Sequence, residues 1–584
     1  MKPHWIALTN TTLGVLMAGV NSSILLIALP PIFRGLGIDP LAPSNTSLLL
    51  WVLLGYSVVT TTLLVTVGRV SDIYGRVRLY TIGFAVFTGA SALLTATWST
   101  GTAGALEIIG FRLIQGLGAA ALFANSAAII TDVFPAHRRG LALGANQVAL
   151  VAGQVIGLIL GGILAVIHWR IVFAVSIPFG VAGTLWAWLR LDETARPRGR
   201  QRLDPLGNAA FGIGLTTLLA ALTYGILPYG HSLTGWSNPW VVGGAAVGAF
   251  LLALFVYIET RVPQPMFRLD LFKIRPFAAG NLAGWLAGIA RGGVQFLLVI
   301  WLQGVWLPLH GYPFSITPLW AGIYMLPMMI GYMIGPFSGY LSDRYGARLF
   351  ATLGMALAAL AFCLLAQLDV DFVYWRFAVI LFLLGIGMGL FSSPNTASIM
   401  SSVPEAERGV ASGMRATLQN SGMVLSMILF FTVIILALAG SLPAALTHGL
   451  TAAGLAPAEA GRVAALPPTA ALFAAFLGYN PMQHILPPDI LGGLAPALKT
   501  HLLAREFFPR LIGPPLMQGL RLAFYIAAGM SLVAAIASLM RGRQIYAPPA
   551  AEPTLARGAE TAELENDAAT EVPRDRRKQE ATRT

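Results

Sequence analysis

Three charged residues, Glu107, Arg112 and Arg291, lie inside long apolar stretches of this chain. A charged side chain within a membrane-spanning helix is costly, so it normally faces a cavity, the bundle interior or a partner. The carboxyl of Glu107 could load a proton from one side of a membrane and release it to the other, with Arg112 and Arg291 as the nearby cations. Glu107 and Arg112 are about 140° apart around a helix, so they do not simply pair on one face. Alternatively, Glu107 lies at the outer membrane surface and solvates a helix end.

Amide and aromatic side chains recur in the other apolar stretches. Any one of them is explained by helix packing, but together they indicate a large, amphipathic and sparsely charged cavity. The residues predicted to line it are Asn21, Asn125, Gln147, Gln154, Arg291, Gln295, Trp301, Gln303, Trp320, Tyr324, Asn395 and Gln419.

A short loop occurs twice, at 68–78 and again at 339–348, each time with an aspartate at the end of an apolar stretch and a glycine where the chain turns. Each copy is followed at nearly the same distance by an Arg-Gly-x-Ala-x-Gly segment that begins another helix. Carboxylates are stabilised near helix N-termini. We therefore expect Asp72 near Gly409 and Asp343 near Gly140, each joining one half of the chain to the other. The predicted gate residues are Gly68, Asp72, Gly75, Arg76, Arg139, Asp343, Arg344 and Arg408.

A row of glycines, Gly153, Gly157 and Gly161 with Gly162 beside them, occupies one helix face. Glycines at this spacing let two membrane helices approach closely. Plain packing explains such a row, and a tight contact of this kind could also close the outer side of a transport pathway. The equivalent segment of the second half keeps only Gly422, so the row is expected in one half alone.

These residues require long helices to position them. The chain is 56% hydrophobic and 11% charged, and apolar stretches recur along most of its 584 residues. Apolar stretches of about 18 residues or more predict membrane-spanning helices. We predict an all-α polytopic membrane protein with about fourteen helices, at 7–30, 48–68, 79–99, 104–129, 140–166, 170–190, 205–228, 239–259, 277–304, 318–341, 347–368, 373–400, 409–439 and 518–540.

The net charge of +12 is spread over short connections between these helices, and alternate connections carry most of the arginines. This distribution indicates membrane topology rather than nucleic-acid binding, and it predicts that both termini are cytoplasmic. The single cysteine, Cys363, excludes an internal disulfide framework. The histidines lack ligand spacing, so we expect no metal or other cofactor.

The repeat divides the chain into two pseudo-symmetric six-helix bundles. The first bundle is expected at 1–190 and the second at 277–543, the latter including a long external segment at 441–516. Residues 191–276 are expected to hold cytoplasmic linkers and two peripheral helices, and 544–584 a disordered cytoplasmic tail. A membrane chain whose halves repeat is typical of secondary transporters, with substrate bound between the halves.

Together the loop at 68–78, the Arg112–Ala120 stretch, the glycine row and the Trp51–Tyr56 segment resemble the major facilitator superfamily, and within it the fourteen-helix drug:proton antiporter branch. This resemblance implies the major facilitator fold, with proton-coupled efflux of amphipathic small molecules by alternating access. The sequence departs from the branch twice. Leu158 replaces a usual proline, and Asn21 replaces a usual acid, so position 21 cannot carry a proton.

The function expected from the sequence is multidrug efflux across the plasma membrane by a monomeric antiporter, with protons, the lipid bilayer and a small amphipathic substrate as partners. The same fold allows export of a lipid or a self-made metabolite instead. A membrane enzyme or sensor is the alternative from another class. Against an enzyme stands the lack of a paired acid and base, or of a nucleophile, near one membrane surface.

Overall fold

The computed structural model describes residues 3–38, 45–135, 138–193, 204–230, 232, 234–263, 265, 267–314, 316–404, 407–464, 482, 486 and 492–542. All of them belong to one unit that extends to Gln544. In this described part there is no strand, only an isolated bridge between Tyr229 and Ser232. Fourteen helical stretches within it are long and apolar enough to cross a membrane, which confirms the predicted class and helix count.

The N-terminal half is a helical bundle in which α1 packs along α5, α4 contacts both α2 and α3, and α3 contacts α7. Its segments are α1 (Pro3–Leu36), α2 (Thr46–Tyr74), α3 (Arg76–Ala96), α4 (Gly101–Val133), α5 (Arg139–Ile167), α6 (Ile171–Ala174) and α7 (Ser176–Arg190).

The C-terminal half repeats these pairings. Here α10 packs along α17, α16 contacts α13 and α15, and α15 contacts α23. The segments are η3 (Leu269–Lys273), α10 (Arg275–Trp301), the π-helical turn η4 (Leu302–Trp306), α11 (Leu307–Leu309), α12 (Thr317–Tyr324), α13 (Leu326–Tyr332), α14 (Gly335–Tyr345), α15 (Ala347–Ala366), α16 (Tyr374–Ser401), α17 (Arg408–Ala452), α18 (Pro457–Ala464), α22 (Pro496–Leu502) and α23 (Phe507–Leu539).

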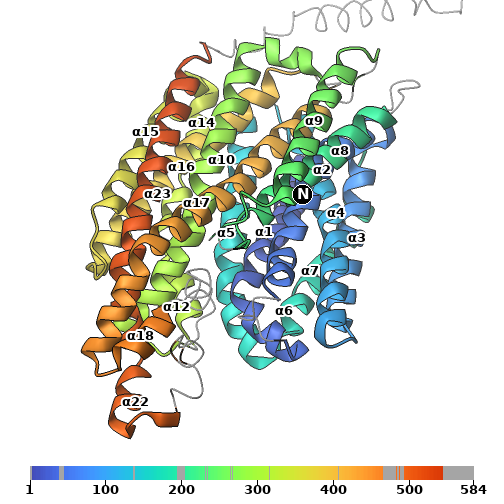
Figure 1. Ribbon diagram of the computed structural model, residues 1–584. Helices are drawn as coiled ribbons and strands as arrows, with labels where there is room; N and C mark the ends of the chain where they lie inside the picture. Colours follow the sequence, from blue (N-terminus) through green and yellow to red (C-terminus); the bar gives the residue numbers. More distant parts are fainter. Residues whose placement is uncertain are drawn as a thin grey trace, which may run out of the picture. The chain divides into compact units, whose positions relative to one another are not determined.

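The two halves meet through two equivalent pairs, α2 against α17 and α5 against α14. Figure 1 shows the C-terminal bundle on the left and the N-terminal bundle on the right. Because the same helices of each half face the partner half, the repeat in sequence becomes a pseudo-twofold arrangement in space. We call the end of the unit that carries Gly75 and Gly346 the repeat-loop end.

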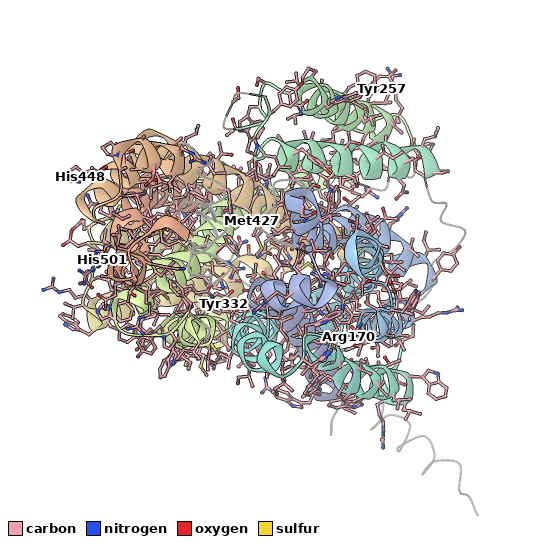
Figure 2. All side chains as sticks on the ribbon, turned by 60° about the horizontal axis from the view of Figure 1, so that its bottom comes forward. Arg170, Tyr257, Tyr332, Met427, His448 and His501 are labelled. Atoms are coloured by element: carbon pink, nitrogen blue, oxygen red, sulfur yellow. The ribbon has the colours of Figure 1, made fainter. Side chains whose placement is uncertain are left out.

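Two further helices, α8 (Pro205–Tyr224) and α9 (Pro239–Glu259), pack on each other and reach the bundle mainly through α2. Each begins with a capping side chain followed by proline: Asp204 accepts from the Leu206 N–H at 3.1 Å, and Asn238 accepts from the Trp240 N–H at 3.0 Å. Figure 2 shows α9, marked by Tyr257, at the outer edge of the molecule. The pair is thus peripheral.

The largest differences from the predicted helices are two helix ends and one broken helix. α17 continues to Ala452 rather than ending at 439, and α23 begins at Phe507 rather than 518, although both contain prolines. Proline is tolerated in membrane helices because neighbouring groups satisfy the freed backbone. The helix predicted at 318–341 is broken into α12, α13 and α14, the last two with proline in the first turn.

Part of one predicted segment and all of another fall outside the described residues. These are most of 465–491 in the predicted external segment and the whole predicted tail at 544–584.

Candidate functional site

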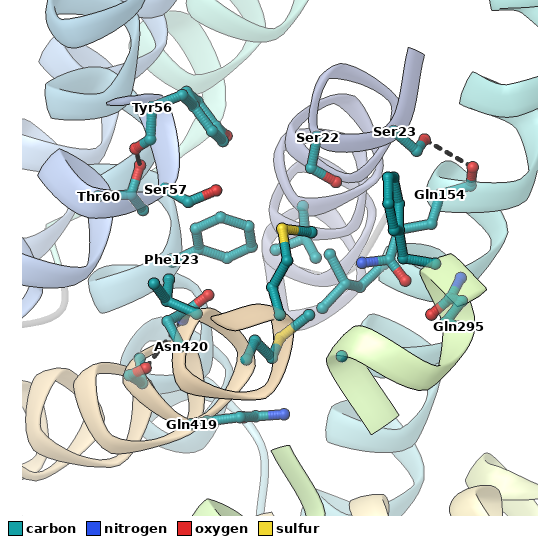
Figure 3. Close-up of a pocket in the computed structure, with 18 of the residues that line it drawn as sticks. Ser22, Ser23, Tyr56, Ser57, Thr60, Phe123, Gln154, Gln295, Gln419 and Asn420 are labelled. Atoms are coloured by element: carbon teal, nitrogen blue, oxygen red, sulfur yellow. Dashed lines mark hydrogen bonds between the residues drawn. The ribbon is translucent and has the colours of Figure 1, made fainter. Parts of the chain in front are cut away.

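A central cavity of about 180 Å³ is lined by helices of both halves. Its walls come from α1, α2, α4 and α5 of the N-terminal half and from α10 and α17 of the C-terminal half. In Figure 3, Ser57 and Phe123 of the N-terminal half lie across the same space from Gln295 of α10. A ligand in this cavity would touch both halves, as alternating access requires.

Several residues predicted from sequence line this cavity. They are Gln147, Gln154, Gln295 and Gln419. Asn395 lines a smaller neighbouring pocket, which it shares with Gln419. Amides from both halves therefore face the cavity, as the pattern of polar residues in apolar stretches predicted.

Other predicted cavity residues lie elsewhere. Trp301 packs in an aromatic core with Phe372, Phe377 and Phe524, and Gln303 is buried within the π-helical turn. Tyr324 shares a hydrogen bond of 2.8 Å with Tyr312 in an aromatic cluster that includes Trp320. Aromatic packing within the C-terminal half, rather than a ligand, accounts for these residues.

Asn125 is also turned away from the cavity, and its amide donates to the carbonyl of Ala121, one turn earlier in α4. Its neighbours Phe123 and Ser126 line the cavity instead. Which of these adjacent residues faces the cavity depends on the rotation of α4 about its axis, and the sequence alone does not determine that rotation.

Sequence reasoning missed the charged residue of the cavity wall. Arg415 lines both the central cavity and the smaller pocket, and its guanidinium donates to the Gln419 side-chain oxygen at 2.9 Å. Its position inside an apolar helix, two turns after the Arg408 start of α17, is the signal that could have found it. Tyr56, Met423 and Met427 also line the wall and were not predicted.

Asn21 and Arg112 are in direct contact, behind the cavity wall. The Arg112 guanidinium donates to the side-chain oxygen of Asn21 and, at 2.8 Å, to that of Gln115. It also stacks over the ring of Tyr56, 4.5 Å from the centroid. Arg112 is only 1% exposed, so this membrane-buried cation is held by neutral acceptors where the related branch usually has an acid.

The carboxylate of Glu107 binds the turn between α3 and α4. It accepts from the backbone N–H of Ser99 at 3.1 Å and from that of Trp98 at 3.4 Å. Arg291 instead contacts Met423, with its guanidinium nitrogen 4.0 Å from the sulfur. The contacts of Glu107 are those of a helix-end cap, the second of the two roles that the sequence left open.

At the repeat-loop end, each aspartate of the repeat lies at a helix N-terminus of the opposite half. Asp72 accepts from the Val410 N–H of α17 at 3.0 Å, and Asp343 accepts from the Gly140 N–H of α5 at 3.0 Å. The turning glycines that follow, Gly75 and Gly346, have φ values of 108° and 87°. Only glycine adopts such values without strain.

The two copies differ in charge pairing. Asp72 pairs with Arg76 at 2.8 Å, Arg76 pairs with Asp132 of α4, and Asp132 lies 3.5 Å from Arg408 of the other half. In the second copy the position of Arg76 is taken by Ala347. The first contact is therefore an ion-pair network across the halves, whereas the second consists of hydrogen bonds, one from the Gly140 N–H to Asp343 and one from the Ser393 hydroxyl to the Gly140 carbonyl at 2.7 Å.

The remaining predicted gate residues have distinct positions. Gly68 lies so close to α17 that an added Cβ would be 2.8 Å from the Gly409 oxygen. Arg139 donates to the carbonyls of Thr131 and Phe134, both at 3.1 Å, and so holds the α4–α5 turn. Arg344 is exposed and stacks on Tyr340 of its own helix, away from the contact between halves.

Sequence reasoning also missed Glu193, just after α7. Its carboxylate accepts from the backbone N–H groups of Arg76, Val77 and Arg78, at 2.8, 3.2 and 3.1 Å. These are the first free N–H groups of α3, where an anion is favourable. Glu193 therefore fixes the repeated loop from the end of the same half.

The glycine row on α5 packs against α1. An added Cβ at Gly153, Gly157 or Gly161 would meet the carbonyl oxygens of Leu16, Val20 and Ile24 respectively. This contact lies within the N-terminal half. Gly162, in contrast, faces the other half, with an added Cβ 3.2 Å from Leu319 of α12.

The helix equivalent to α5 in the second half, α17, keeps only Gly422 of the row, yet that half also has a close contact built on glycines. In the C-terminal half the glycines are on the other helix of the pair, α10. An added Cβ at Gly288 would lie 2.7 Å from the Gln419 oxygen of α17, and one at Gly292 would lie 2.9 Å from that of Met423. The close α10–α17 approach thus mirrors the α1–α5 approach. The glycines lie on the second helix of the first pair, α5, but on the first helix of the other pair, α10.

Comparisons with known proteins agree with this architecture. Residues 11–427 match the family model described as Major Facilitator Superfamily. The riboflavin transporter RibZ of Clostridioides difficile is 30% identical over 74% of this chain and 88% of its own length. The tetracenomycin C resistance and export protein of Streptomyces glaucescens is 25% identical over 92% of this chain and 91% of its own.

Among solved structures, the proton:xylose symporter XylE shares the fold, with a TM-score of 0.52 and 12% identity over 91% of this chain and 94% of its own. The family match spans both halves that build the cavity. The chain therefore belongs to the major facilitator superfamily and is a membrane transporter, not an enzyme.

Proposed function

We propose that this protein exports amphipathic small molecules across the cell membrane by alternating access. The observation that carries the proposal is the central cavity, which is built by both halves, combined with two matching contacts that join the halves at the repeat-loop end. Breaking these contacts and rocking the halves would expose the cavity to the repeat-loop side. The export named in the tetracenomycin C relative supports the direction.

The repeat-loop end is proposed to face the cytoplasm, as are both termini, because Arg76, Arg268 and Arg408 gather there and short cytoplasmic connections carry excess arginine. We expect a monomer, since one chain supplies the whole cavity wall that is described.

The proton gradient is the proposed driving force. The described cavity wall contains no carboxylate, so a proton and a substrate would not compete for an acid there. Coupling would have to use a group outside the wall.

The test is accumulation in proteoliposomes, with and without an imposed pH gradient. Three probes cover the chemistry: ethidium as a cation, pyrenebutyrate as an anion and riboflavin as a metabolite. Uptake of at least one probe above protein-free liposomes supports the proposal, and dependence on the gradient supports proton coupling. No uptake of any probe would refute it. Uptake of riboflavin alone would support the second candidate, a metabolite transporter, which the similarity to RibZ favours.

Alternating access has its own test at the α2–α17 contact, where the Thr417 hydroxyl donates to the Thr61 carbonyl at 3.2 Å. In a Cys363→Ala background, Thr61→Cys with Thr417→Cys should cross-link the halves. We expect oxidation to stop uptake and dithiothreitol to restore it, whereas each single variant stays active. Full activity of the cross-linked protein would contradict rocking at this contact.

A further inference from the structure

We propose that the central cavity binds amphipathic anions, with the anionic group against the guanidinium of Arg415. This assignment rests on the proposed function and deepens it by naming the charge class of the substrate.

The charge around the cavity has one sign. Among the lining residues that the structure describes, Arg415 is the only charged one, and there is no aspartate, glutamate or lysine. Arg415 also lines the smaller pocket, beside Asn281 and Asn395. Its guanidinium therefore lies between two open spaces, within reach of a ligand in either.

Arg415 has unused hydrogen-bonding capacity. A guanidinium has five N–H donors. The described contacts of Arg415 include one hydrogen bond, to Gln419, and its Nε is buried without an acceptor. No described carboxylate lies within ion-pair distance of it. Arg415 is partly buried, so its charge is only partly solvated and has no counter-charge. An incoming carboxylate, sulfonate or phosphate would supply both the charge and the acceptors.

Two further cations stand behind the wall. Arg291 contacts Met423, and Arg112 stacks over Tyr56, while both Met423 and Tyr56 line the cavity. Neither arginine has an ion-pair partner in the described part of the chain. Three guanidiniums without a compensating acid make the potential in the cavity positive, which attracts anions and repels cations.

Acids of the membrane helices are engaged elsewhere, among them Asp343, which accepts from the Gly140 N–H. Asp72 and Asp132 are paired with Arg76 at the repeat-loop end, and Glu107 binds the α3–α4 turn. Asn21, which accepts from the Arg112 guanidinium, is neutral. None of these groups offsets the charge of Arg415.

The rest of the wall suits the apolar body of a ligand. Phe123, Phe296, Met423 and Met427 line the cavity together with several leucines. Methionine side chains are flexible and polarizable, so they adapt to varied apolar shapes. A cavity with one cation in an apolar wall selects an amphipath over a small inorganic anion.

The experiment measures equilibrium binding of three matched fluorescent probes to the purified full-length protein in nanodiscs. Pyrenebutyrate, pyrenebutanol and pyrenebutylammonium share the aromatic body and differ in charge. We expect wild-type protein to bind pyrenebutyrate most tightly and pyrenebutylammonium most weakly. Arg415→Gln should weaken pyrenebutyrate about tenfold or more, the scale of a lost charged hydrogen bond, and leave pyrenebutanol nearly unchanged. Arg415→Lys should retain part of the preference.

Arg510→Gln is the matched control, because Arg510 is exposed and pairs with Glu506 far along the chain from the cavity helices. It removes the same charge and should leave all three affinities unchanged. The proposal is overturned if wild-type protein binds the cation as tightly as the anion, a comparison that needs no variant. It is also overturned if Arg415→Gln keeps its affinity for pyrenebutyrate, or if the wild-type protein binds pyrenebutyrate no better than pyrenebutanol.

The two proposals fail separately. Uptake of ethidium but not of pyrenebutyrate in the proteoliposome assay would leave the exporter standing and overturn the anion assignment. Absence of uptake for every probe would refute the exporter itself.

Discussion

The contact between α1 and α5 gives a quantitative prediction for Gly161→Ala. The added Cβ would lie 2.6 Å from the carbonyl oxygen of Ile24. A carbon and an oxygen in ordinary contact are about 3.3 Å apart, so the two helices would have to separate by ~0.7 Å. α1 cannot easily move, because Gly153 and Gly157 hold it at the same close approach and the Ser23 hydroxyl donates to the Gln154 carbonyl at 2.6 Å.

Overpacking of this kind costs about 1–3 kcal/mol. A matched control separates this cost from the intrinsic preference of alanine for helices, which contributes about 1 kcal/mol in its favour. Gly110 lies inside α4 with no atom within 4 Å of an added Cβ. Gly110→Ala gains the same helix propensity without the clash, so the difference between the two variants isolates the contact.

The assay is thermal unfolding of both variants in one detergent at one scan rate, followed by tryptophan fluorescence. We expect Gly161→Ala to unfold at a lower temperature than Gly110→Ala, and uptake to fall with it while membrane insertion persists. Equal or higher unfolding temperatures for Gly161→Ala would show that α1 and α5 separate freely, and the packing argument would be refuted.

Three other substitutions test single contacts. Asp72→Asn should reduce uptake into proteoliposomes more than Asp343→Asn does. Asp72→Asn removes an ion pair, whereas asparagine at position 343 can still accept the backbone hydrogen bond and only the charge is lost. A larger effect of Asp343→Asn would contradict this asymmetry. Asn21→Asp should raise the unfolding temperature, since it gives the buried Arg112 a counter-charge. Glu107→Gln should retain pH-dependent uptake, because the side chain caps a turn; loss of that dependence would assign the coupling role to Glu107.

The helices, the repeat and its glycine turns could be predicted because each depends on local sequence. Long apolar stretches specify membrane helices, and a turn with positive φ specifies glycine. The helix ends at Ala452 and Phe507 could not be predicted, since proline ends helices in water but is tolerated in a bundle that satisfies the backbone elsewhere.

The cavity wall could be predicted only in part, because the rotation of each helix depends on packing. Gln295 lines the cavity, yet Gln303, eight residues later and about 80° further around an ideal helix, does not. Between them the helix changes to π geometry at Leu302–Trp306, which shifts side chains around the axis. No apolar pattern in the sequence signals that change.

The ion-pair network shows the same division between local and tertiary information. Repetition of the loop predicted that Asp72 would reach the helix start at Gly409, since two copies of one contact follow from two copies of one motif. The partner of Arg76 did not follow, because Asp132 comes from the far end of α4 and no spacing rule connects it to the loop. The second copy has alanine at the position of Arg76, so its contact lacks the ion pair. The two contacts that close this end therefore differ in charge pairing, and we expect opening to be most sensitive to changes at Asp72, Arg76 and Asp132.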